Sequence, residues 1–195
     1  MTDATFVHAV VRAPRPVAPA VMGAVSELAP WLALAGRSGI GWASDEVPVI
    51  LAGDPESALA ARVAAAGGEV ERVIRLVATV RPTDIEPPEL VGGVVALRTF
   101  EVAESDAAEF VELSAAAWPT FEELYAARVL GLFRQSDPAA HLTFLLATWY
   151  DSLSEWERSR EAVGAQSGPA SDAGRRFRRR REITLRTQVR IGVPL

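Results

Sequence analysis

The sequence predicts an α+β protein made of two tandem βαββαβ modules. The length of 195 residues accommodates two compact domains of about 90 to 100 residues each. A composition of 49% apolar and 23% charged residues is typical of a folded globular protein. Short β-branched runs and Ala-rich helical segments follow one another in an order that repeats once along the chain.

The first half contains the six segments of one such module. Pro55 at the first helical position and Gly67 beyond the last turn make the second helix the best defined of them. Pro82, Pro87 and Pro88 then predict a linker. The segments are strands at 5–12, 38–43, 47–52 and 71–80 and helices at 17–34 and 55–66.

The second half repeats this order with longer connections. Trp118 and Pro119 are expected to end its first helix, and Ser152 with Glu155 forms a capping box that opens its second helix. A Gly-, Ser- and Ala-rich loop is expected at 164–174. The segments are strands at 94–102, 127–134, 141–149 and 182–191 and helices at 105–117 and 152–163.

The two halves also share sequence. Residues 74–81 (IRLVATVR) match residues 183–190 (ITLRTQVR) at four of eight positions. Internal duplication explains this match, with module boundaries at 1–90 and 91–195. Convergence of two unrelated segments on a common βαββαβ motif is the alternative.

The composition excludes several kinds of chemistry. All twenty basic residues are Arg, and the chain has no Cys, so a Schiff-base lysine, a thiolate nucleophile and a cysteine zinc site are all ruled out. The net charge of −5 argues against nucleic acid as a partner. No cofactor-binding motif is present, and no cofactor is expected.

The sequence offers no segment of about 20 uninterrupted apolar residues for a membrane span, so no membrane association is expected. Asp3, Arg12 and Arg15 interrupt the N-terminal apolar run, which is unlike a secretory signal. A cytoplasmic protein is therefore expected.

Five segments of the second half resemble the NIPSNAP family, and together they cover about residues 94–191. The first half lacks the L-R-T and Y-D-S-L motifs and looks like a diverged copy. The segments are VVALRTFEV at 94–102, AAWPTFEEL at 116–124, ARVLGLFR at 127–134, TWYDSLSEWERSRE at 148–161 and REITLRTQV at 181–189.

The resemblance implies ferredoxin-like modules whose antiparallel sheets pair face to face as a dimeric α/β-barrel. Strand 141–149 is apolar on both faces, which agrees with a sheet covered on both sides. The second sheet could come from the same chain or from a partner, and a homo-oligomer, most simply a dimer, is expected.

The family motifs leave activity open. The protein is expected to be a small-ligand-binding or assembly module, and the alternative is a cofactor-free oxygenase or isomerase acting on a small organic substrate.

Strand arginines and nearby aromatic residues form the candidate ligand site, for a small anionic or aromatic ligand. A buried guanidinium needs a carboxylate or an anionic ligand, so structural pairing with Glu101 or Glu182 is the competing interpretation. No catalytic residue can be named. The candidate residues are Arg98, Arg128, Arg134, Arg186, Trp118, Tyr125, Trp149 and His141.

Two further features are interpreted as structural. His8 and His141 are the only imidazoles, and they have no carboxylate at metal-ligand spacing, so no metal site is expected. The arginine run 175–181 could bind nucleic acid or an acidic surface, but it is interpreted as a solvated helix face, because Glu155, Glu157 and Glu161 offer local compensation.

Overall fold

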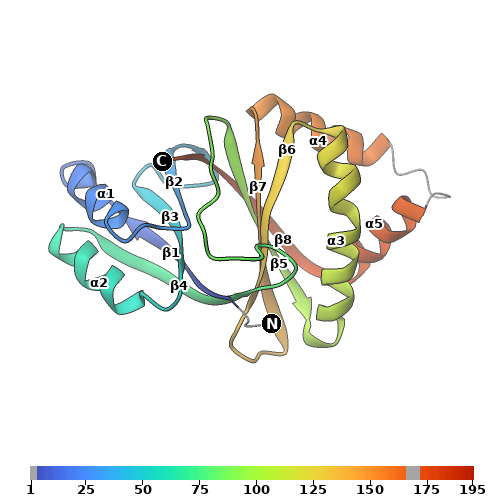
Figure 1. Ribbon diagram of the computed structural model, residues 1–195, viewed down its shortest axis with the longest axis horizontal. Coiled ribbons are helices and arrows are strands. Elements are labelled where there is room, and N and C mark those ends of the chain that lie inside the picture. Colours follow the sequence, from blue (N-terminus) through green and yellow to red (C-terminus); the bar gives the residue numbers. More distant parts are fainter. Residues whose placement is uncertain (1–3, 166–171) are drawn as a thin grey trace.

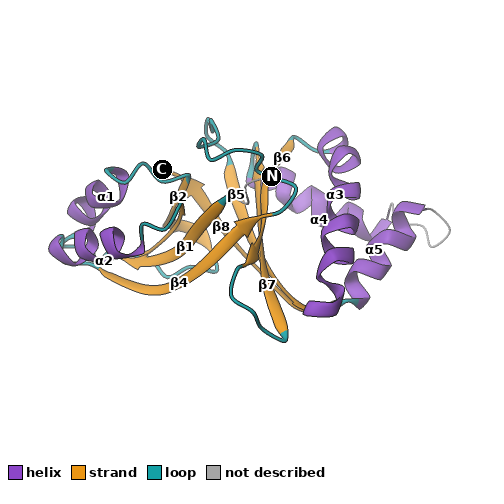
Figure 2. Cartoon of the chain, turned by 60° about the horizontal axis from the view of Figure 1, so that its bottom comes forward, coloured by secondary structure: helices purple, strands orange, loops and turns teal. Residues whose placement is uncertain are grey.

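Eight antiparallel strands close into one barrel in the computed structural model, which describes residues 4–165 and 172–195 (Figures 1 and 2). The α+β class predicted from the sequence is confirmed. The strands are β1 (Thr5–Arg12), β2 (Leu32–Ile40), β3 (Glu46–Ala52), β4 (Glu69–Ala78), β5 (Val94–Ala103), β6 (Ala127–Gln135), β7 (His141–Tyr150) and β8 (Thr184–Pro194). The helices are α1 (Ala18–Ser26), α2 (Glu56–Ala65), α3 (Ala107–Leu124), α4 (Leu153–Ala165) and α5 (Asp172–Glu182), and a 3-10 turn, η1 (Glu104–Asp106), precedes α3.

The strand order shows how the two halves of the chain combine. Around the barrel it is β1-β3-β2-β8-β5-β7-β6-β4, so each half contributes four adjacent strands. Within each half the fourth strand pairs with the first, the first with the third, and the third with the second, which is the ferredoxin-like order. An internal duplication would produce this agreement, but common descent and the boundary between 1–90 and 91–195 stay predictions.

Two seams between the halves close the barrel within a single chain. At one seam β2 pairs with β8, where Leu34 lies opposite Pro194. At the other, β4 pairs with β6, where Val77 lies opposite Arg134. Closure satisfies the backbone groups that an open sheet edge would leave free.

Helices cover the outside of the barrel on two sides. Helices α1 and α2 lie on the outer face of the N-terminal half, and α3, α4 and α5 lie on the outer face of the C-terminal half (Figures 1 and 2). Val21, Val25, Leu59 and Val63 are the buried residues of α1 and α2, and all four face the sheet. The helix-facing layers are therefore separate from the barrel interior.

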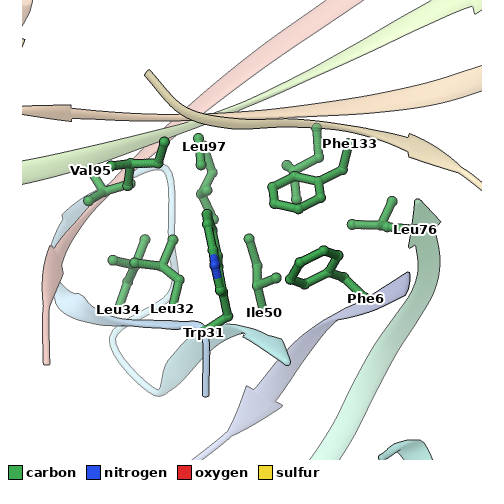
Figure 3. Close-up of a cluster of buried hydrophobic side chains, with 12 residues drawn as sticks. Phe6, Trp31, Leu32, Leu34, Ile50, Leu76, Val95, Leu97 and Phe133 are labelled. Carbon is green, nitrogen blue, oxygen red and sulfur yellow. The ribbon is translucent and has the colours of Figure 1, made fainter. Parts of the chain in front are cut away.

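Large side chains fill the middle of the barrel (Figure 3). Phe6, Trp31 and Phe133 come from β1, the segment before β2, and β6, and their rings meet edge to face with centroids 5.0 to 5.7 Å apart. Leu76 and Leu97 pack around them. We call the buried cluster of Phe6, Trp31, Leu32, Leu34, Ile50, Leu76, Val95, Leu97, Leu130, Phe133, Leu145 and Ala147 the interior plug.

The helix predicted over 17–34 is too long. Helix α1 ends at Ser26, Ala29 adopts a left-handed φ of 46°, and Pro30 follows it. Residues 32–40 instead form β2, which pairs with β3 and β8. The apolar spacing of three and four was misleading because Leu32 belongs to a strand that is buried on the barrel side.

The break predicted at Trp118 and Pro119 is also wrong. Helix α3 continues through Pro119 to Leu124. A proline in a helix interior costs about 3 kcal/mol. Burial of Phe110 and Trp118, on the face that packs against β5, β6 and β7, offsets that cost.

The remaining boundaries move by a few residues. The strands predicted at 38–43 and 71–80 are found at 32–40 and 69–78, and the last strand begins at Thr184 instead of residue 182. The predicted loop 164–174 falls partly outside the described residues. Its described flanks are helical, since α4 extends to Ala165 and α5 begins at Asp172.

Truncation of the interior plug should destabilise the whole barrel. We expect Phe133→Ala to lower the free energy of unfolding by about 3 to 5 kcal/mol, because it leaves a cavity among rings that cannot close together. Urea unfolding followed by circular dichroism measures the change. Val91→Ala, at a side chain that is 90% exposed, is the control and should change stability by less than about 0.5 kcal/mol. A loss below about 1 kcal/mol for Phe133→Ala would show that the plug does not hold the barrel together.

Candidate functional site

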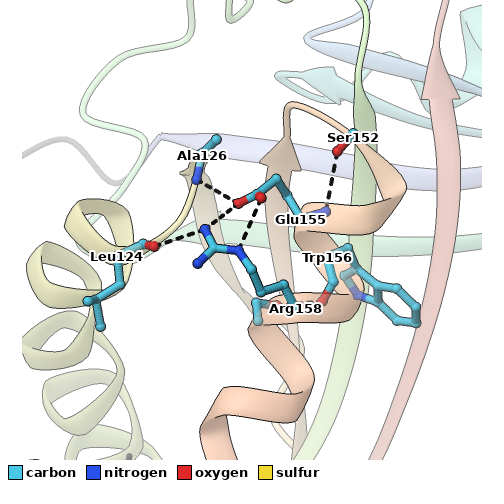
Figure 4. Close-up of polar contacts among 7 residues, drawn as sticks. Leu124, Ala126, Ser152, Glu155, Trp156 and Arg158 are labelled. Carbon is cyan, nitrogen blue, oxygen red and sulfur yellow. Dashed lines mark hydrogen bonds and ion pairs between the residues drawn. The ribbon is translucent and has the colours of Figure 1, made fainter.

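Helix α4 is fixed to the rest of the C-terminal half by a polar network (Figure 4). Its first turn has one half of the predicted capping box: the backbone N–H of Glu155 donates to Ser152 Oγ at 3.3 Å. The carboxylate of Glu155 accepts the backbone N–H of Ala126 at 3.1 Å and pairs with Arg158. Arg158 also donates to the carbonyl of Leu124 at 3.1 Å, so α4 is held against the connection between α3 and β6.

Helix α5 is held in place independently. Arg179 makes a bidentate pair with Glu109 of α3, with both N···O distances at 2.8 Å. Ile183, directly after the helix, is buried in the core beneath α3. These contacts place Arg180 against the sheet, where its guanidinium carbon lies 4.8 Å from the ring centroid of Phe100 and 5.1 Å from that of Phe110.

Arg98 and Arg180 are neighbours between these helices and the outer face of β5. Burial, followed by the charge of Arg98, lowers the pKa of Arg180 to about 10, and the Nε of Arg180 is buried without a hydrogen-bond partner. Burial also lowers the pKa of Arg98; Tyr150 opposes this shift and Arg160 adds to it. We call these two side chains the arginine pair.

Tyr150 lies near Arg98, and Trp156 packs against the cluster that contains Tyr150. Burial raises the pKa of the Tyr150 phenol, although a hydrogen bond with Ser159 and the charges of Arg98 and Arg160 oppose the shift. Tyr150 therefore stays protonated at neutral pH. The indole Nε1 of Trp156 is buried without a partner.

The arginine pair lacks the carboxylate that buried guanidinium groups usually have. Among the side chains that the structure describes, no ion pair joins Arg98 or Arg180 to a carboxylate. Glu182, one expected partner, lies near Arg179 instead, at 3.8 Å. Two desolvated like charges destabilise each other, and an anion placed between them would remove the repulsion.

The strand register shows which way Arg98 points. Leu97 and Thr99 face the barrel interior, so Arg98 between them faces the helices. Its competing partner Glu101 lies opposite Arg186 in the strand register, on the other face of the sheet.

The predicted aromatic residues do not form one site with Arg98. Trp118 is buried on the sheet-facing side of α3, with the Arg81 guanidinium carbon 5.2 Å from its ring centroid. Tyr125 packs against Phe121, and Trp149 packs on the interior plug. All three side chains pack against other side chains of the fold, away from Arg98.

The other predicted polar residues are exposed and lie apart from the arginine pair. Arg128 donates to the carbonyl of Glu89 at 2.6 Å, beside an open groove of about 350 Å³ between the linker and β6. Arg134, Arg186 and His141 are exposed on β6, β8 and β7. Of the eight candidates, only Arg98 lies at the arginine pair.

Arg180 was missed because the run 175–181 was interpreted as one solvated helix face. Its neighbours Arg179 and Arg181 are exposed, whereas Arg180 turns toward Phe100 and Phe110. The helical periodicity carries a signal that could have identified Arg180. Phe177 lies three residues before Arg180, and the buried Ile183 lies three residues after it.

A small cavity lies inside the barrel. Its volume is about 60 Å³, and the buried His8 lines it together with Arg72 and Arg190. Sites for small organic molecules usually measure about 300 to 1,000 Å³. This cavity is therefore too small for an organic substrate of the kind that the oxygenase alternative requires.

Comparisons with known proteins agree on the fold and leave the function open. No family model matches the chain, and no curated protein matches it. An anthrone oxidase-like protein aligns with 99% of this chain and 92% of its own, at 11% identity and a TM-score of 0.60. A chlorite dismutase variant from Candidatus Nitrospira defluvii aligns with 100% of this chain and 92% of its own, at 10% identity and a TM-score of 0.59. A putative monooxygenase from Lactobacillus acidophilus aligns with 100% and 94%, at 12% identity and a TM-score of 0.53.

The similar solved structures also include NIPSNAP family proteins, as the sequence resemblance indicated. One from Agrobacterium tumefaciens covers 55% of this chain at 14% identity and a TM-score of 0.41. The three matches that span the whole chain show its ferredoxin-like α/β-barrel fold, and their identities of 10 to 12% show the fold alone. None of the described helices has the length and apolar character needed to cross a membrane.

The absence of a carboxylate partner predicts how Arg98 affects stability. We expect Arg98→Met to leave the free energy of unfolding unchanged or to raise it by up to about 1 kcal/mol, because methionine keeps the packing of the stem and removes the repulsion. Thermal and urea unfolding in ligand-free buffer measure this.

Arg81→Met is the matched comparison. Arg81 pairs with Glu122 at 2.7 Å and donates to the carbonyl of Val129, so its loss should cost about 1 to 2 kcal/mol. If Arg98→Met were instead to lose about 2 kcal/mol or more, Arg98 would belong to a structural ion pair.

His8 predicts an acid-dependent loss of stability. Burial, with smaller contributions from Arg72 and Arg190, lowers its pKa from 6.5 to about 4. Between these values the unfolded chain binds more protons than the folded chain, so stability falls as the pH is lowered through this window, by on the order of 3 kcal/mol at its acid end.

Urea unfolding at pH 7 and at pH 4.5 tests this dependence. His8→Gln should remove much of the difference between the two pH values. His141→Gln, at an exposed position, should preserve it. Equal pH dependence in the wild type and in His8→Gln would contradict the assignment.

Proposed function

We propose that this protein binds a small anionic ligand at the arginine pair, between α4, α5 and the outer face of β5. One observation carries the proposal: Arg98 and Arg180 lie together in desolvated surroundings, and no described acidic side chain pairs with them. An anion would convert this unfavourable arrangement into two charge-assisted interactions.

The surroundings favour a carboxylate attached to an aromatic or apolar body. The rings of Phe100 and Phe110 lie beneath Arg180, and the buried Nε1 of Trp156 offers a further donor. Sites of this kind place a few polar groups among apolar ones to orient the ligand. A strongly hydrated inorganic anion would gain less from the aromatic surroundings.

An enzyme of the cofactor-free oxygenase or isomerase type is the second proposal, at the same location. Tyr150 is the one observation that favours it, because a protonated phenol beside two guanidinium groups could donate a proton to a bound substrate. The names of the similar solved structures are compatible with this reaction class. Turnover that Tyr150→Phe abolishes without weakening binding would favour the enzyme.

Cytoplasmic location and a homodimer are also proposed. The sequence expectation of a dimer came from the need to cover both faces of the sheet, which closure of the barrel within one chain already meets. Light scattering of the purified protein distinguishes a monomer from a dimer.

A ligand screen tests the binding proposal. We expect benzoate, salicylate or a related aromatic carboxylate to bind the wild type in isothermal titration calorimetry. Arg98→Met and Arg180→Met should each weaken binding about tenfold or more, because each removes one charge-assisted contact. Arg15→Met removes an exposed positive charge on the N-terminal half and should leave the affinity unchanged.

Two results would contradict the proposal. One is that no aromatic or aliphatic carboxylate binds. The other is binding that all three variants weaken equally, which would reveal only a response to net charge.

A further inference from the structure

A second polar site lies inside the barrel, on the opposite face of the sheet from the arginine pair. The cavity of about 60 Å³ rests on Leu97 and Leu145, which belong to the interior plug. Its other walls come from β1, β4, β5, β8 and the connection between β2 and β3. These walls are His8, Trp42, Arg72, Ile74, Thr99, Gln188 and Arg190.

Three nitrogen atoms in this cavity wall are buried without a hydrogen-bond partner. They are Nε2 of His8, Nε1 of Trp42 and Nε of Arg190. His8 as a whole residue is only 6% exposed, and the guanidinium carbon of Arg190 lies 4.6 Å from the ring centroid of Trp42. Buried polar atoms nearly always have partners, so three unpartnered atoms around one cavity indicate that the cavity has an occupant.

The charges of the wall specify the kind of occupant. Arg72 and Arg190 are the charged residues among those that line the cavity, and no acidic side chain lines it. The depressed pKa of His8, caused first by burial and then by these two arginines, makes its imidazole neutral at pH 7. Water could accept from the three donors but would leave the positive potential uncompensated.

The size of the cavity limits the occupant further. One water needs about 10 to 15 Å³, so the cavity of about 60 Å³ has room for about four to six atoms of that size. A planar oxyanion such as nitrate or formate fits this limit. The aromatic carboxylates proposed for the arginine pair exceed it.

We infer that this cavity is a binding site for a small monovalent oxyanion, held by N–H groups of His8, Trp42 and Arg190. The site is independent of the arginine pair: it lies on the other face of β5 and would remain if the first proposal failed.

Nuclear magnetic resonance of histidine-labelled protein tests the inference, because His8 and His141 are the only histidines. The probes are sodium nitrate and sodium formate, added to the full chain at constant ionic strength, with sodium gluconate as the bulky anion. We expect nitrate or formate to shift the imidazole signals of His8 saturably and to leave those of the exposed His141 unchanged. At saturation the measured pKa of His8 should rise by about one unit or more, because a nearby negative charge favours the imidazolium form.

Arg190→Gln supplies the matched variant. It should weaken nitrate binding about tenfold or more, whereas Arg15→Gln, which removes an exposed charge, should leave it unchanged. If Arg190→Gln does not fold, the wild-type titration decides alone. No response of His8 to nitrate or formate, or an equal response to gluconate, would overturn the inference and leave a water-filled cavity.

Discussion

Closure of the barrel within one chain is the constraint on which the rest of the structure depends. Two half-sheets with the same strand order meet at the β2–β8 and β4–β6 seams, and neither seam can form unless both halves are folded. The seams face each other across the interior plug, where Phe6 and Trp31 of the first half contact Phe133 of the second. A two-half barrel of this kind needs no second copy to cover its inner faces.

This constraint determines where binding sites can lie. The plug occupies the middle of the barrel, and the cavity around His8 and Arg190 lies beside it. At about 60 Å³ this cavity does not hold the larger ligands proposed for the outer face. Helices α4 and α5 are each anchored separately, through Glu155 and Arg179, and the space between them and β5 is where the arginine pair lies. Adjacent residues of β5 belong to the two sites: Thr99 lines the interior cavity, and Arg98 belongs to the arginine pair on the outer face.

The sequence predicted the architecture better than the site. Strand and helix order followed from apolar periodicity. The Ser152 half of the capping box was correct because it depends on residues three apart, whereas the Glu155 carboxylate bonds to Ala126 instead. The 17–34 helix failed because pairing with β3 and β8, which no local pattern encodes, determines that 32–40 is a strand. Arg98 was identified because an arginine in a buried strand is unusual. Arg180 was not, because it lies among six other basic or aromatic residues and its burial depends on where Arg179 and Glu109 anchor α5.

Anomalous diffraction from crystals soaked in bromide tests the central claim most directly, because the claim concerns an anion at one defined position. The account predicts an anomalous peak between the guanidinium groups of Arg98 and Arg180, and the loss of that peak in Arg98→Met crystals grown and soaked in the same way. A carboxylate of the chain itself within about 4 Å of either guanidinium group, with no bromide there, would contradict the account, because the arginine pair would then be a structural ion-pair cluster.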